Sequence, residues 1–275
     1  MQNVFAGLRD PSAHVQPEMM FTFLDELDIH DPLQPAKRRA LQMLDVQPGL
    51  RVLDVGCGVG QEAQRLARQV GPEGFVAGID QSETLIDEAR RRALAADLPI
   101  DFRVGDAHAL DFADTSFDRC RVERVLLYVR DPQRVVGEMA RVLKPGGRMV
   151  ALDFDMGGLV VDSPDLALGR RMLTLIDEAV PDGWAGRRLP RWFADCGLVD
   201  IDVVPTLIRA PLTTFRLAFE ALLRDAAAAG KADPAEVETW WESLIAADRA
   251  GRFFSLFLGF IVSGRKPNGE SAEHA

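Results

Sequence analysis

The stretch VLDVGCGVG, which runs from Val52 to Gly60, decides the fold of this chain. A short apolar run leads into three glycines at alternating positions, Gly56, Gly58 and Gly60. Glycine lets the backbone turn sharply and approach a ligand closely. Residues 61–70 then have helical spacing, and the first amides of such a helix would face that ligand. The pattern predicts a strand, a ligand-binding loop and a helix, with a plain tight turn as the alternative.

On both sides of this loop the sequence alternates between short apolar runs and segments with helical periodicity. Turn signals such as Gly71-Pro72 and the segment 144–147 separate them. The alternation predicts an α/β fold, a doubly wound and mostly parallel sheet with helices on both faces. The predicted strands are 51–55, 75–80, 100–104, 117–122, 148–154, 200–208 and 253–263, and the predicted helices are 18–27, 35–44, 61–70, 82–96, 131–143, 165–180, 187–196, 213–229 and 234–250.

The composition of the chain limits the kinds of binding partner that we expect. The 275 residues carry 32 basic and 42 acidic side chains, a formal net charge of -10. A chain this acidic lacks the positive field that binding to a phosphate backbone requires, so we expect no nucleic-acid partner. Three cysteines without paired spacing (Cys57, Cys120 and Cys196) suggest neither a disulfide framework nor a zinc site, and we expect no bound metal.

The sequence shows no sign of secretion or membrane insertion. The N-terminus, MQNVFAGLRD, has neither the basic start nor the long apolar run of a signal peptide. The most apolar segment, 253–264, has 12 uncharged residues, whereas a membrane-spanning helix needs about 20. We therefore expect a cytoplasmic protein without a membrane partner, in which this segment is a buried strand.

Three acidic residues accompany the first three predicted strands. Asp80 ends the second strand, 20 residues after Gly60, where a carboxylate can accept hydrogen bonds from ribose hydroxyls. Asp106 follows the third strand at the same edge of the sheet, beside amides that can meet an adenine edge. Asp54 interrupts the apolar first strand, which is costly unless the acid serves the loop or a cation. These positions favour a ligand at the glycine loop.

In order along the chain, VLDVGCGVG, GID, GDA and the segment from Phe117 to Gly147 (FD…DP…RVLKPGG) resemble the motifs of class I S-adenosylmethionine-dependent methyltransferases. The likeness is to the small-molecule group that includes the ubiquinone and menaquinone C-methyltransferases, and it covers about residues 35 to 155. It implies a Rossmann-like sheet of seven strands with an antiparallel last strand. It also implies S-adenosyl-L-methionine as the cofactor and S-adenosyl-L-homocysteine as the product.

The resemblance assigns cofactor contacts position by position. Gly56, Gly58 and Gly60 should pass close to the methionine part and the ribose. Asp54 should orient the loop and the cofactor's amino group, and Asp80 should hold the ribose hydroxyls. The other implied cofactor contacts are Gln81 and Leu85 near the adenine, Asp106 and Ala107 at the adenine edge, and Arg124 beside the methionine moiety.

The chain departs from these relatives after the fourth predicted strand. Many of them read Asn-Val-Leu-His-His there, whereas this chain reads Arg-Val-Leu-Leu-Tyr from Arg124 to Tyr128. The missing imidazole pair puts a histidine general base in doubt. Tyr128 is then the nearest polar replacement, or else an aromatic residue that packs on the following helix.

Two acids at the end of the fifth predicted strand are further catalytic candidates, because ligands of open α/β sheets bind at the carboxyl ends of the strands. Asp153 and Asp155 flank Phe154, and we expect strand alternation to direct one of them into the cleft, with capping of the next loop as the alternative. Glu123 and Arg124 should lie on different faces of the sheet, or form a salt bridge. The lone histidines His14, His30 and His108 are expected to be mostly surface or structural residues.

We expect residues 1–34 to form an N-terminal helical lid and residues 35–275 the Rossmann-like domain, with helical cap insertions at about 160–196 and 212–250. The cap would close over the substrate or form the surface of a homodimer, and the sequence leaves both open. Aromatic and methionine side chains gather in the lid and cap, where most would form core and a subset would line an apolar acceptor pocket. They are Met19, Met20, Phe21, Phe23, Trp184, Trp192, Phe215, Phe219, Trp240, Trp241, Phe253 and Phe254.

Methyl transfer from a sulfonium is an in-line displacement with an activated donor, so a protein mainly aligns the reactants and excludes water. The leading hypothesis is an enzyme of small-molecule biosynthesis that methylates an O, N or C atom of a small, largely apolar metabolite. A cyclase or isomerase that keeps the same cofactor and a non-catalytic cofactor-binding module are the alternatives. Gln61 disfavours a nicotinamide dehydrogenase, whose fingerprint has a glycine at that position.

Overall fold

The computed structural model describes residues 16–30 and 32–268, and its centre is a seven-stranded sheet with the strand order β3-β2-β1-β4-β5-β7-β6. β1 to β5 pair in parallel, whereas β7 runs antiparallel to both of its neighbours, β5 and β6. The predicted fold class, including the antiparallel last strand, is confirmed. The strands are β1 (Arg51–Val55), β2 (Phe75–Asp80), β3 (Ile100–Val104), β4 (Phe117–Glu123), β5 (Leu143–Val161), β6 (Val199–Arg209) and β7 (Ser255–Arg265).

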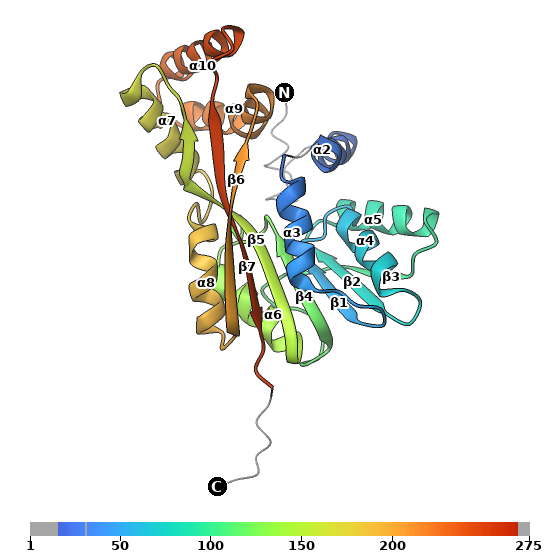
Figure 1. Cartoon of the computed structure of the whole chain (residues 1–275). Coiled ribbons are helices and arrows are strands. Elements are labelled where there is room, and N and C mark those ends of the chain that lie inside the picture. Colours follow the sequence, from blue (N-terminus) through green and yellow to red (C-terminus); the bar gives the residue numbers. More distant parts are fainter. Residues whose placement is uncertain (1–15, 31, 269–275) are drawn as a thin grey trace.

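Helices cover both faces of the sheet (Figure 1). α3 packs on β4, β5 and β7, and the Arg148 guanidinium donates to the Met43 carbonyl at its end. α8 packs on the opposite face of β5 and β7, where Phe193 lies against Gly264. The described helices are α2 (Pro17–His30), α3 (Gln34–Leu44), α4 (Gln61–Val70), α5 (Glu83–Ala95), α6 (Pro132–Val142), α7 (Leu166–Glu178), α8 (Ala185–Asp195), α9 (Leu212–Ala228) and α10 (Pro234–Arg249).

Local signals set the helix ends in the first half of the chain. The Ser82 side chain accepts a hydrogen bond from the Leu85 amide and begins α5, as the sequence predicts. Asp131 accepts from the Arg134 amide and begins α6, with Pro132 at the first helical position. These caps stand just after the carboxyl ends of strands, so they fix where each strand gives way to a ligand-facing loop.

β5 is longer than the sequence predicts. The sequence predicts a turn at 144–147 and a strand at 148–154, but the strand continues from Leu143 to Val161. The Gly146 amide donates to the Lys266 carbonyl and the Lys266 amide donates to the Gly147 carbonyl, so the glycine turn is itself paired with the end of β7. Beyond Asp155 the pairing with β7 shifts instead of ending. Partners far along the chain therefore override the local turn signal.

The long strands β5, β6 and β7 carry the cap, which consists of α7, α9 and α10 at their far end (Figure 1). The Phe215 ring lies at its centre and contacts the rings of five other aromatic residues at centroid distances of 5.0 to 6.1 Å. These are Phe219, Trp240, Trp241, Phe253 and Phe257. Most of the predicted cap aromatics are therefore core, whereas Trp184 and Phe254 are exposed.

α2 lies over the glycine loop and the start of α5. Met20 packs in a small buried cluster with Val59 and Leu85, which is separate from the main core. Asp25 accepts from the Gln61 side chain at 2.8 Å and from the Arg92 guanidinium at 2.6 Å. One helix of the predicted lid thus contacts the loop that the sequence singled out.

Within the described residues, no helix has the length and apolar character needed to cross a lipid bilayer. The predicted buried strand at the apolar segment 253–264 is confirmed as β7. The expectation for His14 lies outside the described residues, and the side chains of Phe23 and His30 are likewise not described.

Candidate active site

The glycine loop is held against β2 by its own backbone. The amides of Gly56 and Cys57 both donate to the Ile79 carbonyl, at 2.8 and 3.0 Å. Gly56, Gly58 and Gly60 have φ angles of 70°, 54° and 78°, a left-handed conformation that glycine adopts without strain. Among the described residues, a Cβ added to Gly58 would have one neighbour within 4 Å, Leu24 of α2, at 3.9 Å. The predicted strand, loop and helix are confirmed, and few described atoms lie close to Gly58 at the position of that Cβ.

Asp80 ends β2 and links that strand to the loop. Its Oδ2 accepts from the Gly58 amide at 3.0 Å, and its Oδ1 accepts from the Ser82 amide at 3.0 Å. Burial raises the pKa of Asp80, and the backbone donors oppose that rise. Each carboxylate oxygen keeps further acceptor capacity, so the side chain is fixed and can still accept from a ligand hydroxyl.

Asp54 is buried in β1, and the sequence did not anticipate its partner. Arg121 of β4 stands beside it in register, with the guanidinium Nη1 2.8 Å from Asp54 Oδ1. Asp54 Oδ2 has no hydrogen-bond partner within the described part of the chain. Burial raises the pKa of Asp54 to about 6, although the charge of Arg121 opposes the rise. The only sequence signal for this pair was an arginine between apolar residues of a central strand.

Glu123 and Arg124 contact each other, so the expectation that they lie on different faces is wrong and the salt-bridge alternative is confirmed. Arg124 Nε lies 3.4 Å from Glu123 Oε1. Arg124 has a φ of 56°, which takes it out of the strand's alternation as β4 ends. Arg124 therefore lies just beyond the end of β4, and its charge also acts on Asp153.

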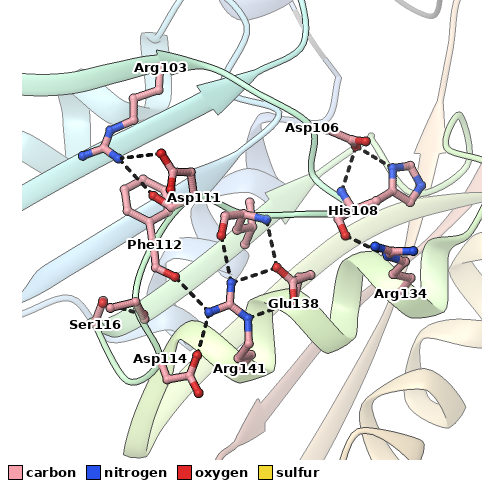
Figure 2. A network of polar contacts seen from close by, with 12 residues as sticks. Arg103, Asp106, His108, Asp111, Phe112, Asp114, Ser116, Arg134, Glu138 and Arg141 are labelled. Carbon is pink, nitrogen blue, oxygen red and sulfur yellow. Dashed lines mark hydrogen bonds and ion pairs between the residues drawn. The ribbon is translucent and has the colours of Figure 1, made fainter.

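The loop that carries Asp106 and Ala107 is clamped from α6, as Figure 2 shows. The Arg141 guanidinium donates to the carbonyls of Leu110 and Phe112, each at 2.8 Å. Glu138 pairs with Arg141 and accepts from the Leu110 amide at 2.8 Å. These two charged side chains hold the backbone that follows the predicted adenine contact, a role the sequence analysis missed.

Asp106 itself is bound to the next residues of its loop. Its Oδ1 accepts from the His108 amide at 2.9 Å and lies 2.6 Å from His108 Nδ1 (Figure 2). The hydrogen bond that the His108 amide donates is the main cause that lowers the pKa of the Asp106 carboxyl. Arg134 donates to the His108 carbonyl and ties this turn to α6. His108 thus has a structural position beside Asp106, in agreement with the expectation for a lone histidine.

Asp153 and Asp155 lie on the same face of β5, opposite Phe260 and Leu258 of β7, so the expectation that alternation would separate them is wrong. Asp153 is fully buried, and its carboxylate accepts from the amides of Leu126 and Leu127. Burial raises the pKa of Asp153 to about 7, although these backbone donors oppose the rise. Asp153 therefore fixes the segment after β4.

Asp155 is bound by α8. It forms a bidentate ion pair with Arg187, whose Nη2 lies 2.6 Å from Asp155 Oδ1. The Arg187 guanidinium also stacks on the Trp184 ring, 4.6 Å from its centroid. Tyr128 is half-buried against the main core, and its amide donates to the Val125 carbonyl. The geometry gives both aspartates structural partners, and the catalytic role of Tyr128, Asp153 and Asp155 stays a prediction.

The described residues contain no cluster of histidine, cysteine, aspartate and glutamate that could hold a metal ion. Burial raises the pKa of the Cys57 thiol well above its usual range, so this loop cysteine is protonated and a poor nucleophile. A nucleoside cofactor fits the site better. At Gly58 a ligand can approach the loop backbone closely. The fixed Asp80 carboxylate can accept hydrogen bonds from ribose hydroxyls, and Asp54 Oδ2, which has no hydrogen-bond partner among the described residues, can receive a cation.

The fold and the residues at the carboxyl ends of its parallel strands thus suit a nucleoside cofactor. Residues 46–180 match the family model described as a methyltransferase domain. The chain therefore belongs to the class I S-adenosylmethionine-dependent methyltransferases, with S-adenosylmethionine as the cofactor.

Relatives extend over different shares of the chain. A 37.1 kDa protein in transposon TN4556 of Streptomyces fradiae, described as uncharacterized, is 35% identical over 88% of this chain and 70% of its own length. The methyltransferase GfsG of Streptomyces halstedii is 40% identical over 48% of this chain and 49% of its own. The demethylmenaquinone methyltransferase of Listeria monocytogenes is 38% identical over 42% of this chain and 50% of its own length. The chain thus matches about half the length of the two methyltransferases.

Solved structures agree on the fold. The YcgJ protein of Bacillus subtilis has a TM-score of 0.60 at 19% identity and covers 87% of this chain and 100% of its own. The [4+2]-cyclase SpnF has a TM-score of 0.51 at 23% identity, and the match covers 86% of this chain and 82% of the SpnF chain. At these identities the likeness concerns the fold alone, in agreement with the seven-stranded sheet.

Proposed function

We propose that this protein transfers a methyl group from S-adenosylmethionine to an O, N or C atom of a small, largely apolar metabolite. The observation that carries the proposal is the convergence of a glycine loop, Asp54 and Asp80 at one edge of the sheet, beneath helix α2. The match of residues 46–180 to the methyltransferase model and of nearly half of the chain to named methyltransferases supports the transfer, and the apolar cap supports an apolar acceptor.

In this proposal the glycine loop and three acids hold the cofactor. Gly56, Gly58 and Gly60 bring the backbone close to the methionine part, with Asp54 at its amino group. Asp80 accepts from the ribose hydroxyls. Gln81, Leu85, Asp106 and Ala107 lie around the adenine, and Arg124 lies beside the methionine moiety. The bound cofactor supplies an activated methyl group, so the chain's own task is alignment and exclusion of water.

The acceptor side supports a passive mechanism better than a general base. Asp153 and Asp155 are engaged by backbone amides and by Arg187, which leaves Tyr128 as the proposed polar residue near the acceptor. We propose residues 1–34 as the lid and the helices between the late strands as the cover of the acceptor. An acceptor whose nucleophile needs no strong base fits this site.

A mass measurement tests the proposed reaction. The purified protein is incubated with methyl-deuterated S-adenosylmethionine and a panel of apolar acceptors that includes a demethylated naphthoquinone. We expect one acceptor to gain the mass of one labelled methyl group while S-adenosylhomocysteine accumulates. A cofactor that binds but gives no labelled product with any member of the panel contradicts methyl transfer.

A second candidate function is a cyclisation that retains the cofactor without consuming it. The specific observations are the [4+2]-cyclase among proteins of the same fold and the absence of the imidazole pair after β4. In that case a substrate would be rearranged at constant mass, with no S-adenosylhomocysteine released. A filled acceptor space with no turnover would favour the third alternative, a binding module.

A further inference from the structure

Three buried charged side chains form a row on the neighbouring strands β1 and β4, beside the glycine loop. Arg121 of β4 reaches Asp54 at 2.8 Å on one side and Glu123 at 2.5 Å on the other. Each of these side chains is less than a tenth exposed. Buried ion pairs rarely stabilise a fold more than well-packed apolar residues would. Packing alone therefore does not account for this row in the middle of an otherwise apolar sheet.

The row continues into α3, the helix that follows the lid. Lys37 Nζ lies 3.5 Å from Glu123 Oε1, and both side chains are less than a tenth exposed. Arg124 approaches the same oxygen at 3.4 Å. Burial would raise the pKa of Glu123, but the surrounding positive charges lower it to about 2. Glu123 therefore stays ionised and fixes Arg121 from the side away from Asp54.

One atom in the row has no partner. Asp54 Oδ2 is buried and makes no hydrogen bond within the described chain, and its residue lies two positions before the first loop glycine. A buried carboxylate oxygen without a donor is costly unless a cation or donor arrives with a ligand. The opposing effects of burial and of Arg121 on the Asp54 pKa make this carboxyl sensitive to its neighbours.

We propose that Arg121 is a positioning residue for cofactor binding, which keeps Asp54 ionised and aims Oδ2 at the cofactor's ammonium group. Glu123, held by Lys37 of α3, keeps Arg121 in place. The inference rests on the proposed cofactor site, but it concerns affinity and not transfer. The charged or titratable groups around Asp54 are Arg121 and Glu123 of β4, Glu62 of α4, Lys37 of α3 through Glu123, and Cys57 and Asp80 at the loop.

The test is the affinity for S-adenosylhomocysteine, measured by calorimetry between pH 5 and 7.5. In the wild-type protein the affinity should rise with pH, bend near pH 6, where Asp54 is half ionised, and level off by about pH 7. Arg121→Met removes the positive partner, so the affinity should fall at least tenfold at pH 6.5 and still be rising at pH 7.5. Arg121→Lys should stay within half a pH unit of the wild-type profile.

Glu123→Gln should move the profile the other way. It removes a negative charge near Asp54, so the affinity should level off at a lower pH than in the wild type. Asp54→Asn should bind weakly and without a bend in this range. If Arg121→Met does not fold, an Arg121→Lys profile close to that of the wild type and a Glu123→Gln profile displaced to lower pH still test the proposal.

Three results would overturn the inference. These are an equal loss of affinity at every pH in the Arg121 and Glu123 variants, a shift of both profiles in the same direction, or a bend that persists in Asp54→Asn. Failure here leaves labelled methyl transfer intact, whereas failure of the proposed function would show as an absent mass gain. The two outcomes are therefore distinguishable.

Discussion

At the scale of single residues, Gly60 is the point where the glycine loop turns into α4. Its φ is 78°, and a Cβ there would lie 2.5 Å from Phe102 Cζ. Gly60→Ala should therefore lower the free energy of unfolding by about 2 to 4 kcal/mol, through backbone strain and overpacking. Denaturation in urea measures this change.

Gly197 provides the matched control for Gly60. It has the same φ of 78°, but a Cβ added to it would meet no atom of the described residues within 4 Å. Gly197→Ala should cost only the backbone strain, about 1 kcal/mol. Equal losses in the two variants would show that the close packing of Gly60 against β3 carries no energy.

Asp153 makes stability depend on pH. Its pKa is about 7 in the fold because burial raises it, and near its ordinary value of 3.8 in the unfolded chain. The folded state therefore holds this proton more tightly, and the stability it contributes is lost as pH rises from about 4 through 7. From pH 5 to 8 the wild type should lose on the order of 2 kcal/mol relative to Asp153→Asn.

Unfolding measured across that pH range in both proteins checks the sign. A difference that grows in the wild type's favour as pH rises would mean that the backbone donors at Leu126 and Leu127 outweigh burial, and that Asp153 is ionised in the fold at neutral pH.

At the scale of elements, the Asp25 carboxylate is one of the contacts that fasten α2 to the site. Asp25 binds Gln61 of α4 and Arg92 of α5, and it is 42% exposed. Asp25→Ala should change global stability by less than about 1 kcal/mol because exposed ion pairs contribute little. It should nevertheless speed amide hydrogen exchange in Pro17–His30 and the release of S-adenosylhomocysteine, since the lid is then less firmly held.

Glu236→Ala is the control for this lid contact, because Glu236 is 43% exposed and pairs with Arg171 on the cap. It should lose similarly little stability and leave exchange in α2 unchanged. If Asp25→Ala leaves exchange in α2 and the release rate at wild-type values, the Asp25 contacts do not fasten the lid.

The clamp from α6 makes a second prediction for an element. Arg141→Met removes the donors that hold the carbonyls of Leu110 and Phe112, so it should cost about 1 to 3 kcal/mol of stability. The loop at Asp106 should then exchange its amides faster and bind S-adenosylhomocysteine more weakly. Arg91→Met, which removes an exposed guanidinium that pairs with Glu88 at the same spacing, should do neither.

The first half of the chain was predictable because its signals are local. Short apolar runs, Ser82 and Pro132 mark β1 to β4 and the helices between them, and the observed bounds agree within a residue or two. The length of β5 was not predictable, since its partner β7 lies more than a hundred residues away and pairs with the Lys144–Gly147 segment. Long-range pairing there outweighs the turn propensity of proline and glycine.

The site residues whose positions follow from the backbone could be predicted from the sequence. The charged partners of the buried acids could not. The glycines, Asp80 and Asp106 follow strand ends, and strand order brings them together at one edge. The partners of Asp54 and Asp155 come from β4 and α8, and nothing local in the sequence couples Asp54 to Arg121 or Asp155 to Arg187. The donors to Asp153 also come from outside β5, and the catalytic role of Asp153 and Asp155 stays a prediction.

At the scale of the whole molecule, the two sides of the sheet carry different parts of the proposed site. The parallel strands β1 to β4 carry the loops proposed to hold the cofactor, and the long strands β5 to β7 carry the aromatic cap (Figure 1). The lid helix α2 lies over the first side. The acceptor would then be enclosed between parts far apart in sequence, so acceptor choice can vary while the cofactor loops stay fixed.

The central claim is that S-adenosylhomocysteine binds at the glycine loop and is held there by Asp80. Calorimetry on ligand-free protein should show binding of one molecule per chain, with an affinity about 10 to 100 times weaker in Asp80→Ala. Asp87→Ala, an exposed acid of α5 paired with Arg90, should bind like the wild type. An absence of binding, or an unchanged affinity in Asp80→Ala, would contradict the account.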